Sequence, residues 1–434
     1  MLARLGTLAG RAPQRDADAT GGHSVSEGMA STPPLAIDFP LRSPAPETQA
    51  RGTYRQQASR LARQERWDDL TEMLRAADLG HERTPAGMPV ARLLCEGAFA
   101  DTISCARRAT GSGDSEAAHR VLRNWAAALG PTVEAPWRAL LLASAQLAVA
   151  ALFRGAPGAA EPDAARSAAA LEHLEAALMT LRPHDPRRLG SAALAAARCR
   201  VIELMPGPEA RLAAEYEALV ATEPDCPAHL RAYGVDLSPA RFGSWPALDR
   251  AARRMAMLTA AHWGSGAYAW MWWDVLAQQP AGFAHVEAEY FVAALHDIIE
   301  ARPGQHMANK LAAYCGLALS GDAPPASARA RITGCFDWIV QDHLREVHPE
   351  IWTAARPLPG CADPAAALRL GTSRARSALA EYFADEVARG RSVIFTETGI
   401  RLQPAPGGAC TLAPCPALAY PRRNLRDEDP PCLT

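Results

Sequence analysis

The pattern of hydrophobic and polar positions predicts helices along most of the chain. Near the start of the patterned region, Trp67, Leu70 and Leu74 recur at the spacing of one helical face. From about residue 53 to about residue 390, runs of Ala, Leu, Arg and Glu continue in this manner, separated by breaks that contain Pro or Gly. The sequence therefore predicts an all-α fold, with a helical body over residues 51–390.

The breaks between these helices recur with a period of about 40 residues. When Pro183 and Pro224 are aligned, the segments EAALMTLRPHDP and EALVATEPDCP match at several positions with an offset of 41. Further breaks lie around Gly264 and at Pro303. Proline suits such a boundary because it cannot continue a helix. Because one amphipathic hairpin cannot bury its own apolar face, we expect helical hairpins of this period to stack as an α-solenoid.

This arrangement resembles the tetratricopeptide-like helical repeat proteins, which also have small residues at packing positions and Pro at the unit boundary. The period here exceeds the usual one of about 34 residues. A second stretch, HLRAYGVDLSPARFGSWPALDRAARR at residues 229–254, resembles bacterial helical-repeat families of unassigned function in its Pro-aromatic-Gly-Ser-Trp pattern. Both resemblances imply a helical fold, the second implies a bacterial source, and neither supplies a catalytic residue.

The two ends of the chain differ from this body. Residues 1–50 are rich in Pro, Ser, Gly and Thr and lack a hydrophobic period, so we expect them to be disordered, with Met29 a candidate for the true start. Residues 391–403 contain a β-branched run, a turn and a second short run, which predict a short β-hairpin. The Pro-rich tail at 404–434 is expected to be disordered or to lie as an extended strip on the helical body.

Composition limits the classes of function. The net charge is -2, so no strong field exists to recruit nucleic acid or an anionic membrane. Lys310 is the only lysine, and any mechanism that needs a side-chain amine must use it. The apolar stretch at 139–153 is shorter than the roughly 18 to 20 residues of a spanning helix, which predicts a buried helix and no membrane insertion. No export signal is convincing and no Cys-x-x-Cys pair occurs, which favours reduced thiols and a cytoplasmic location.

Several catalytic motifs are absent from the sequence. No P-loop exists, because Lys310 follows Asn309, and no G-x-S-x-G nucleophile elbow occurs. The stretch GSGAYA at 264–269 formally matches G-x-G-x-x-A, but a dinucleotide fingerprint needs a preceding strand, and the preceding segment has a helical pattern. We therefore predict no cofactor.

Two groups of residues have the chemistry of metal ligands without the usual spacing. The first would lie within one face of a helix and consists of His285, Glu289, His296 and Glu300. It matches neither His-Glu-x-x-His nor Glu-x-x-His, and ordinary polar pairing on a helix surface explains it. The second group, Cys410 and Cys415, is spaced more widely than standard zinc pairs and has no second pair nearby. We predict no metal site.

The stretch AYAWMWWDVLAQQP at 267–280 holds three tryptophans within four residues. On a helix its apolar side chains cover most of the circumference, and Asp274 lies on the narrow polar strip. Such a helix is either enclosed by its neighbours as core or presents aromatic anchors to a partner on the concave face of a solenoid. The second interpretation gives a set of candidate partner-binding residues: Trp263, Tyr268, Trp270, Trp273, Asp274, Asn309 and Lys310.

The hypothesis drawn from the sequence is a non-enzymatic protein- or peptide-binding adaptor that uses an aromatic-rich groove. No catalytic residue is assigned. One alternative is an enzyme of unknown reaction type whose active site lies in the same groove, with carboxylate and His side chains as acid and base. Another is a purely structural helical domain of a larger assembly. All three depend mainly on the expected architecture.

Overall fold

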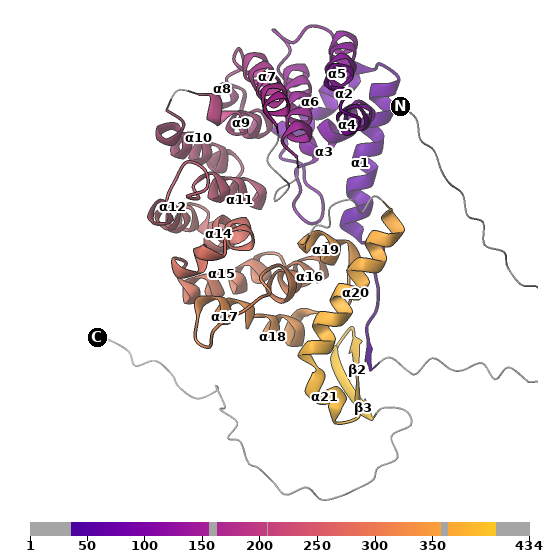
Figure 1. Cartoon of the computed structure of the whole chain (residues 1–434), viewed down its shortest axis with the longest axis vertical. Helices are drawn as coiled ribbons and strands as arrows, with labels where there is room; N and C mark the ends of the chain where they lie inside the picture. Colours follow the sequence, from indigo (N-terminus) through magenta and orange to yellow (C-terminus); the bar gives the residue numbers. More distant parts are fainter. Residues whose placement is uncertain (1–35, 156–162, 206, 357–362, 405–434) are drawn as a thin grey trace, which may run out of the picture. The chain divides into compact units, whose positions relative to one another are not determined.

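The computed structural model describes residues 36–155, 163–205, 207–356 and 363–404. These residues are mostly helical, with a small three-stranded sheet near the C-terminus (Figure 1). The prediction of a predominantly helical chain is therefore confirmed. Met29, Cys410, Cys415 and the rest of the Pro-rich tail after Pro404 lie outside the described residues.

Helices follow one another along the described chain from Pro46 to Ala388. Those before the Cys226 break are α1 (Pro46–Arg63), α2 (Trp67–Leu79), α3 (Val90–Ala98), α4 (Ala100–Gly111), α5 (Ser115–Leu129), α6 (Pro136–Arg154), α7 (Ala164–Leu181), α8 (Pro186–Leu189), α9 (Ala192–Cys199), the 3-10 turn η1 (Ile202–Leu204) and α10 (Pro208–Thr222). The later ones are α11 (Pro227–Asp236), α12 (Trp245–Leu258), α13 (Ala260–Trp263), α14 (Gly266–Gln278), η2 (Pro280–Ala284), α15 (Ala288–Ala301), α16 (Gln305–Ala313), η3 (Tyr314–Ala318), α17 (Ala328–Thr333), α18 (Phe336–Trp338), η4 (Ile339–His343), α19 (Pro349–Ala355), α20 (Pro364–Tyr382) and α21 (Ala384–Ala388).

Local sequence explains many helix starts. Pro136, Pro208 and Pro227 each occupy the first turn of their helix, where the fixed φ of proline suits the backbone and its missing N–H costs nothing. Elsewhere a polar side chain caps the helix: the carboxylate of Asp163 accepts from the N–H of Arg166, for example.

Helices close in sequence pack against one another. α6 lies against α7, α11 against α14, and α19 against α20. Gly234 allows the close approach of α11 to α14, because a Cβ atom at this position would lie 1.8 Å from the carbonyl oxygen of Met271. The buried side chains form two clusters, one contributed by α1 to α9 and the other mainly by α10 to α20, with α14 in the second.

The beginning of the described chain packs against its end. The strand β1 (Ile37–Asp38) pairs in parallel with β2 (Arg391–Thr396), which pairs antiparallel with β3 (Gly399–Pro404). The predicted hairpin at 391–403 is therefore confirmed. The expectation of disorder is wrong for residues 36–50, which form β1 and the start of α1, because Ile37 and Phe39 are buried on the core side of the sheet.

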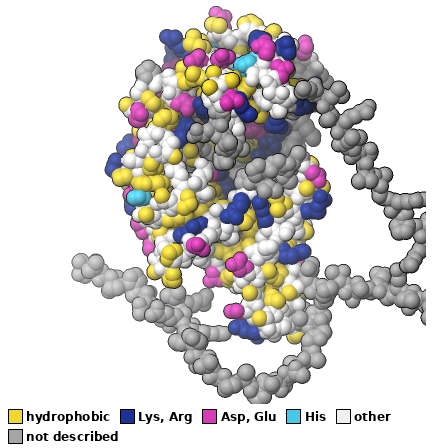
Figure 2. Space-filling model, in the orientation of Figure 1, with side chains coloured by type: hydrophobic (Ala, Val, Ile, Leu, Met, Phe, Trp, Pro, Cys, Tyr) yellow, Lys and Arg dark blue, Asp and Glu magenta, His cyan; other side chains and the backbone are white. Residues whose placement is uncertain are grey.

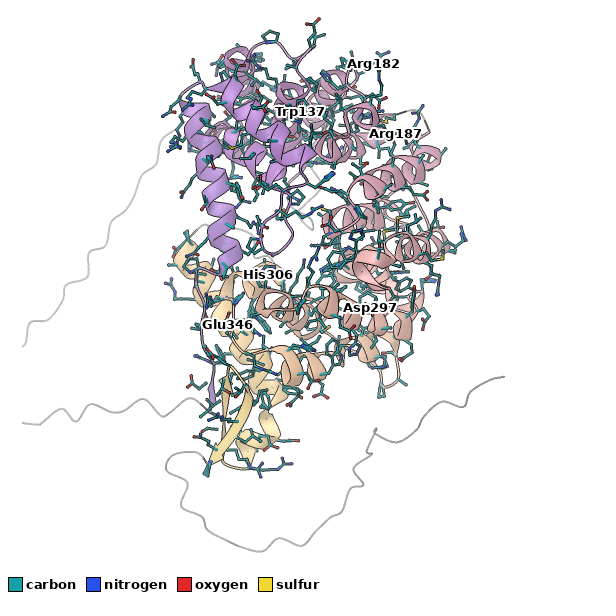
Figure 3. All side chains as sticks on the ribbon, turned by 180° about the vertical axis from the view of Figure 1, so that it is seen from behind. Trp137, Arg182, Arg187, Asp297, His306 and Glu346 are labelled. Atoms are coloured by element: carbon teal, nitrogen blue, oxygen red, sulfur yellow. The ribbon has the colours of Figure 1, made fainter. Side chains whose placement is uncertain are left out.

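α6 is the one described helix that is long and apolar enough to cross a membrane by length and composition, and half of its most apolar window is buried inside the protein. It packs against α3, α4, α5 and α7. The indole of Trp137, on its first turn (Figure 3), donates to the Asp78 carboxylate at 3.1 Å. A core helix satisfies the same length and composition test, and these contacts are those of a core helix.

On the face in Figure 2, hydrophobic, basic and acidic side chains are interspersed.

Candidate functional site

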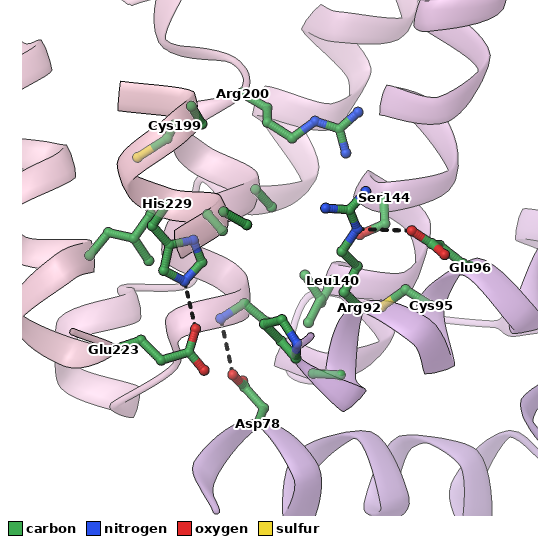
Figure 4. Close-up of a pocket in the computed structure, with 18 of the residues that line it drawn as sticks. Asp78, Arg92, Cys95, Glu96, Leu140, Ser144, Cys199, Arg200, Glu223 and His229 are labelled. Carbon is green, nitrogen blue, oxygen red and sulfur yellow. Dashed lines mark hydrogen bonds and ion pairs between the residues drawn. The ribbon is translucent and has the colours of Figure 1, made fainter. Parts of the chain in front are cut away.

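A pocket of about 470 Å³ lies between α2, α3, α6, α9, α10 and α11. Small and apolar side chains, such as Phe99 and Leu140, line much of it. Its charged groups surround the cavity (Figure 4): Arg92, Glu96 and Arg200 lie on one side, Glu223 and His229 on the other, and Asp78 between the two in this view. A mainly apolar cavity of this size with a few convergent polar groups is typical of a small-ligand site.

The first side of the pocket carries an excess of arginine. Glu96 accepts hydrogen bonds from Arg92 at 2.9 Å and from Arg55 at 2.9 and 2.5 Å, so one carboxylate serves two guanidinium groups. Arg200, the residue after α9, makes no side-chain hydrogen bond or ion pair with any residue that the structure describes. Arg200 is an exposed residue, yet desolvation by its surroundings and, to a smaller extent, the positive charge of Arg92 lower its pKa to about 10. This side therefore has the charge and the donors to hold an anion.

The second side is formed by the junction of α10 and α11, where Glu223 and His229 line the pocket and Cys226 lies close to both. Pro224 follows the end of α10 and Pro227 begins α11, so the chain turns sharply over the sequence EPDCPAH. Glu223 is the first residue after α10, Cys226 immediately precedes α11, and His229 is in its first turn. The ligand atoms of these three side chains lie within 4.8 Å of one another, and all three residues are buried.

Strong electrostatic coupling links the three side chains. The His229 Nε2 atom lies 2.5 Å from Glu223 Oε2. Burial alone would lower the pKa of His229, but the neighbouring Cys226 and Glu223 outweigh it and raise that pKa to about 9. Burial likewise opposes ionisation of the Cys226 thiol, yet the charge and hydrogen bond of His229 hold its pKa below the usual value. A cysteine with this environment has thiolate character.

Residues from three other segments hold the junction in place. Arg83, in the connection between α2 and α3, has its Nη2 atom 3.2 Å from Glu223 and 2.5 Å from Asp225. The Trp263 indole donates to the carbonyl oxygen of Pro224 at 3.1 Å. Arg302 reaches Asp225 at 3.4 Å. The backbone at Glu223 to Cys226 is thus fixed from several directions.

The aromatic residues predicted to bind a partner lie in the core. Trp263, Tyr268 and Trp270 are at most 1% exposed, and Trp273 is 5% exposed. The Trp273 ring stacks on Tyr314 with ring centroids 3.6 Å apart. An indole without an exposed face cannot contact a partner in this conformation, so the expected aromatic anchors are not available there. The reason is that neighbouring helices enclose α14 on nearly all sides, as its circumferential apolar pattern allows.

The predicted polar contacts are mostly engaged within the protein. Asp274 forms a two-pronged ion pair with Arg231 at 2.8 and 2.6 Å. Asn309 is buried, and its side chain has four hydrogen-bonding partners: the carbonyl oxygens of Gln305 and Glu346, the N–H of His348 and the indole of Trp352. Asn309 therefore ties α16 to α19 and the segment before it, which is a structural role.

Lys310 lies against the same aromatic cluster. Its ammonium is 4.6 Å from the centre of the Trp270 ring and 5.8 Å from that of Trp273. Burial lowers the pKa of Lys310 to about 7, with a further contribution from Arg231. The only amine side chain in the chain is therefore partly neutral near pH 7.

The residues of the helix face considered as metal ligands, His285, Glu289 and His296, contact other partners and are not brought together. His285 stacks on Trp245, Glu289 pairs with Arg331 at 2.7 Å, and His296 stacks on Trp338. In the described residues, the group with ligand geometry consists instead of Glu223, Cys226 and His229. The pattern Glu-x-x-Cys-x-x-His in EPDCPAH places three metal-ligand side chains at regular spacing, a signal in the sequence beyond the helix break that its prolines predict.

The stretch GSGAYA connects two helices. α13 precedes it where a dinucleotide fingerprint needs a strand. Gly264 has a φ of +56°, which favours glycine. The backbone N–H and the hydroxyl of Ser265 both donate to Asp297 (Figure 3), at 2.5 and 2.6 Å. This connection is fixed by a side chain of α15.

Comparison with known proteins adds no relative: no family model, no curated protein and no solved structure matches the chain.

Proposed function

We propose that the helices form an α-solenoid of hairpins with a period near 40 residues. The helical elements α7, α10, α13, α15 and η4 end at Leu181, Thr222, Trp263, Ala301 and His343, which are 38 to 42 residues apart. Four of these ends coincide with the breaks from which the period was predicted. Equal spacing of helix ends is what stacked units of one size produce.

Side-chain hydrogen bonds across the chain support the same period. Trp263 donates a hydrogen bond to Pro224, 39 residues earlier. Arg231 donates to Asp274, 43 residues later, and Tyr314 donates to Trp273, 41 residues earlier. The pattern continues with offsets of 42, 38 and 43 in Arg331–Glu289, Gln305–His343 and Trp352–Asn309. Residues one unit apart therefore contact one another repeatedly, as nearest-neighbour stacking requires.

We propose that this chain is a non-enzymatic helical-repeat binding protein whose ligand is a carboxylate with an apolar body. The observation that carries the proposal is Arg200, whose guanidinium lines the pocket beside Arg92 without a partner among the described side chains. A guanidinium pair suits a carboxylate, which can accept two parallel hydrogen bonds. The apolar remainder of the wall suits the body of the ligand. Two sources share this chemistry: the C-terminus of a peptide and a free organic acid.

The proposal keeps the predicted class of function and changes its location. The partner predicted from the sequence is a protein or peptide. The ligand proposed here is the C-terminus of a peptide or a free organic acid, and it binds the pocket between α3, α9 and α11 in place of an aromatic groove on α14. A cytoplasmic setting and a bacterial source remain predictions of the sequence. Arg92 and Arg200 were not candidates at that stage because arginines are common throughout the chain.

The test is a titration with three probes: short peptides with free C-termini, the same peptides with amidated C-termini, and a panel of organic acids. We expect the full chain to bind free carboxylates, and the Arg200→Gln variant to bind them at least about tenfold more weakly, or about 1.4 kcal/mol. Binding of free-ended peptides alone would identify a peptide partner. Binding of the acids alone would identify a metabolite.

The matched control is Arg198→Gln. Arg198 lies two residues from Arg200 and pairs with Glu215 at 3.8 Å outside this pocket. This variant should bind as the unmodified chain does. Equal binding of free and amidated peptides, or unchanged binding by Arg200→Gln, would overturn the proposal.

The alternative function is an enzyme whose active site occupies the same pocket. The observation that favours it is the His229–Glu223 pair in the wall opposite the arginines, because a histidine held by a carboxylate is a common general acid, and its pKa of about 9 keeps His229 protonated near neutral pH. This alternative predicts chemical turnover of a bound acid that the His229→Gln variant loses while still binding it. Recovery of the bound acid unchanged after prolonged incubation would exclude it for that ligand.

A further inference from the structure

The three residues at the α10–α11 junction have the composition of a zinc ligand set. They supply one thiolate sulfur, one imidazole nitrogen and one carboxylate oxygen, all of which zinc accepts. They come from a single tight turn, so their spacing is set by local backbone geometry. We propose that Glu223, Cys226 and His229 bind one divalent transition-metal ion, zinc in the first instance, in the wall of the pocket.

The distances require only a small adjustment. The ligand atoms lie within 4.8 Å of one another. Tetrahedral zinc with bonds of about 2.0 to 2.3 Å holds its ligand atoms about 3.3 to 3.8 Å apart. His229 Nε2 and Glu223 Oε2, now 2.5 Å apart, would separate by about 1 Å. All three side chains come from the seven-residue segment 223–229, so the adjustment is local.

The charges also balance. A Glu223 carboxylate and a Cys226 thiolate together neutralise a divalent cation, while His229 binds as a neutral ligand. Asp225, which lies beside them, is paired with Arg83 at 2.5 Å and with Arg302 at 3.4 Å, so it adds no uncompensated negative charge. A buried site tolerates charged groups only when they are paired in this way. The Arg83 contact at 3.2 Å can also orient the Glu223 carboxylate as an outer partner.

The position of the cluster leaves room for a further ligand. Glu223 and His229 line the pocket, whereas Cys226 lies behind them in the protein. Three protein ligands with a fourth position open to a cavity is the arrangement of metal sites that bind an exogenous group. The proposed metal site does not depend on carboxylate binding at Arg200, and each can fail without the other.

The experiment is a metal titration of the full-length chain after removal of metal by a chelator under reducing conditions. We expect one equivalent of cobalt(II) to bind and to give a thiolate-to-metal charge-transfer absorption, which one equivalent of zinc abolishes. Thermal stability should rise with zinc, because the ion binds the folded chain. Cys226→Ser should lose the charge-transfer band and weaken zinc binding by more than about 100-fold.

The matched control is Cys199→Ser. Cys199 is also buried and lines the same pocket, but it is not part of the Glu223 cluster. This variant should keep the band and the zinc affinity. The His229→Gln variant gives a second test if Cys226→Ser fails to fold, and it should bind cobalt weakly while retaining helical circular dichroism. No stoichiometric binding by the unmodified chain, or a charge-transfer band that survives in Cys226→Ser, would overturn the proposal.

Discussion

The helices α11 and α14 pack directly against each other, yet their polar and aromatic residues do different things. α14 concentrates aromatic side chains, and nearly all of them are enclosed by other helices. The α10–α11 junction holds four residues with metal-ligand chemistry within seven positions, Glu223, Asp225, Cys226 and His229, and two of them line a pocket. Unusual residues are dense in both segments, so what distinguishes the two is whether their side chains reach a cavity.

The physical reason lies in the different requirements of the two kinds of side chain. Burial of an indole is favourable without a specific partner, so large aromatics accumulate wherever a helix is surrounded. A buried carboxylate or imidazole is unfavourable unless it is paired. The grouping of Glu223, Cys226 and His229 in one turn therefore needs an explanation, whereas the grouping of tryptophans in α14 does not.

The largest expected effect comes from removing an aromatic of α14. Trp270→Ala should lower the free energy of unfolding by about 3 to 5 kcal/mol, because the side chain is fully buried and leaves a cavity. Urea unfolding measures the change. The control Met257→Ala removes a side chain that is 73% exposed and should change stability by less than about 0.5 kcal/mol. A folded, equally stable Trp270→Ala variant would show that α14 is not core.

The next effect concerns a polar group in the pocket wall. Asp78→Ala should cost about 2 to 3 kcal/mol, because the carboxylate accepts from the Ser191 hydroxyl at 2.5 Å, the Ala193 N–H at 3.0 Å and the Trp137 indole at 3.1 Å. One buried donor and two partly buried donors then lose their acceptor. Asp68→Ala is the control, since the side chain of Asp68 is 95% exposed. If both variants are equally stable, the polar wall of the pocket does not help to hold the fold together.

Lys310 gives a pH-dependent effect of about 2 kcal/mol. Its folded-state pKa of about 7 lies below the unfolded value of about 10.4. Its favourable contribution is therefore complete above pH 10.4 and is lost as the pH falls toward 7. Lys310→Met removes the titrating group, so the variant should gain about 2 kcal/mol over the unmodified chain between about pH 10 and pH 7. The expected change in the free energy of unfolding is smaller than the difference between the two pKa values alone would give, because Lys310 is only half-buried and contacts Trp270.

The measurement for Lys310 is urea unfolding of both proteins at several pH values. Because the chain has one lysine, amine acylation followed by mass spectrometry adds a direct check. The rate at Lys310 should reach half its maximum near pH 7. A half-maximum near pH 10, with a stability difference that does not vary with pH, would show that the amine is solvated.

The smallest effect on stability is expected at Arg200. Arg200→Gln should change the free energy of unfolding by less than about 0.5 kcal/mol, because the side chain has no partner to lose among the described residues. Arg83→Gln, by contrast, should destabilise by at least about 1 kcal/mol, because Glu223 and Asp225 lose their cation. A large loss of stability in Arg200→Gln would point to a structural contact and argue against a ligand site.

The sequence was sufficient for the helical class, the hairpin at 391–403 and the positions of the main breaks. These features depend on local spacing, such as the prolines at 183, 224 and 303. It was not sufficient for β1, whose two residues are too few to show a period and depend on pairing with β2.

The pocket could not be predicted, because Arg92, Arg200 and His229 come from separate helices and meet only in the folded chain. Glu223, Cys226 and His229 are different, since their spacing is visible in EPDCPAH. The prolines in that segment predict a helix break, and this feature is more conspicuous than the metal-ligand side chains beside them. Asn309 shows the converse case: a polar residue on an inner helix was assigned to a partner, but its hydrogen bonds are all satisfied internally.

The most direct test of the account compares the two regions in one titration. Peptides with free C-termini and the organic-acid panel are titrated into the unmodified chain, the Arg200→Gln variant and the Lys310→Met variant. The account predicts that Arg200→Gln loses binding by at least about tenfold, while Lys310→Met, beside the aromatic cluster, binds as the unmodified chain does. If Lys310→Met loses binding and Arg200→Gln binds as the unmodified chain does, the account is contradicted. The binding site would then lie at the tryptophans of α14.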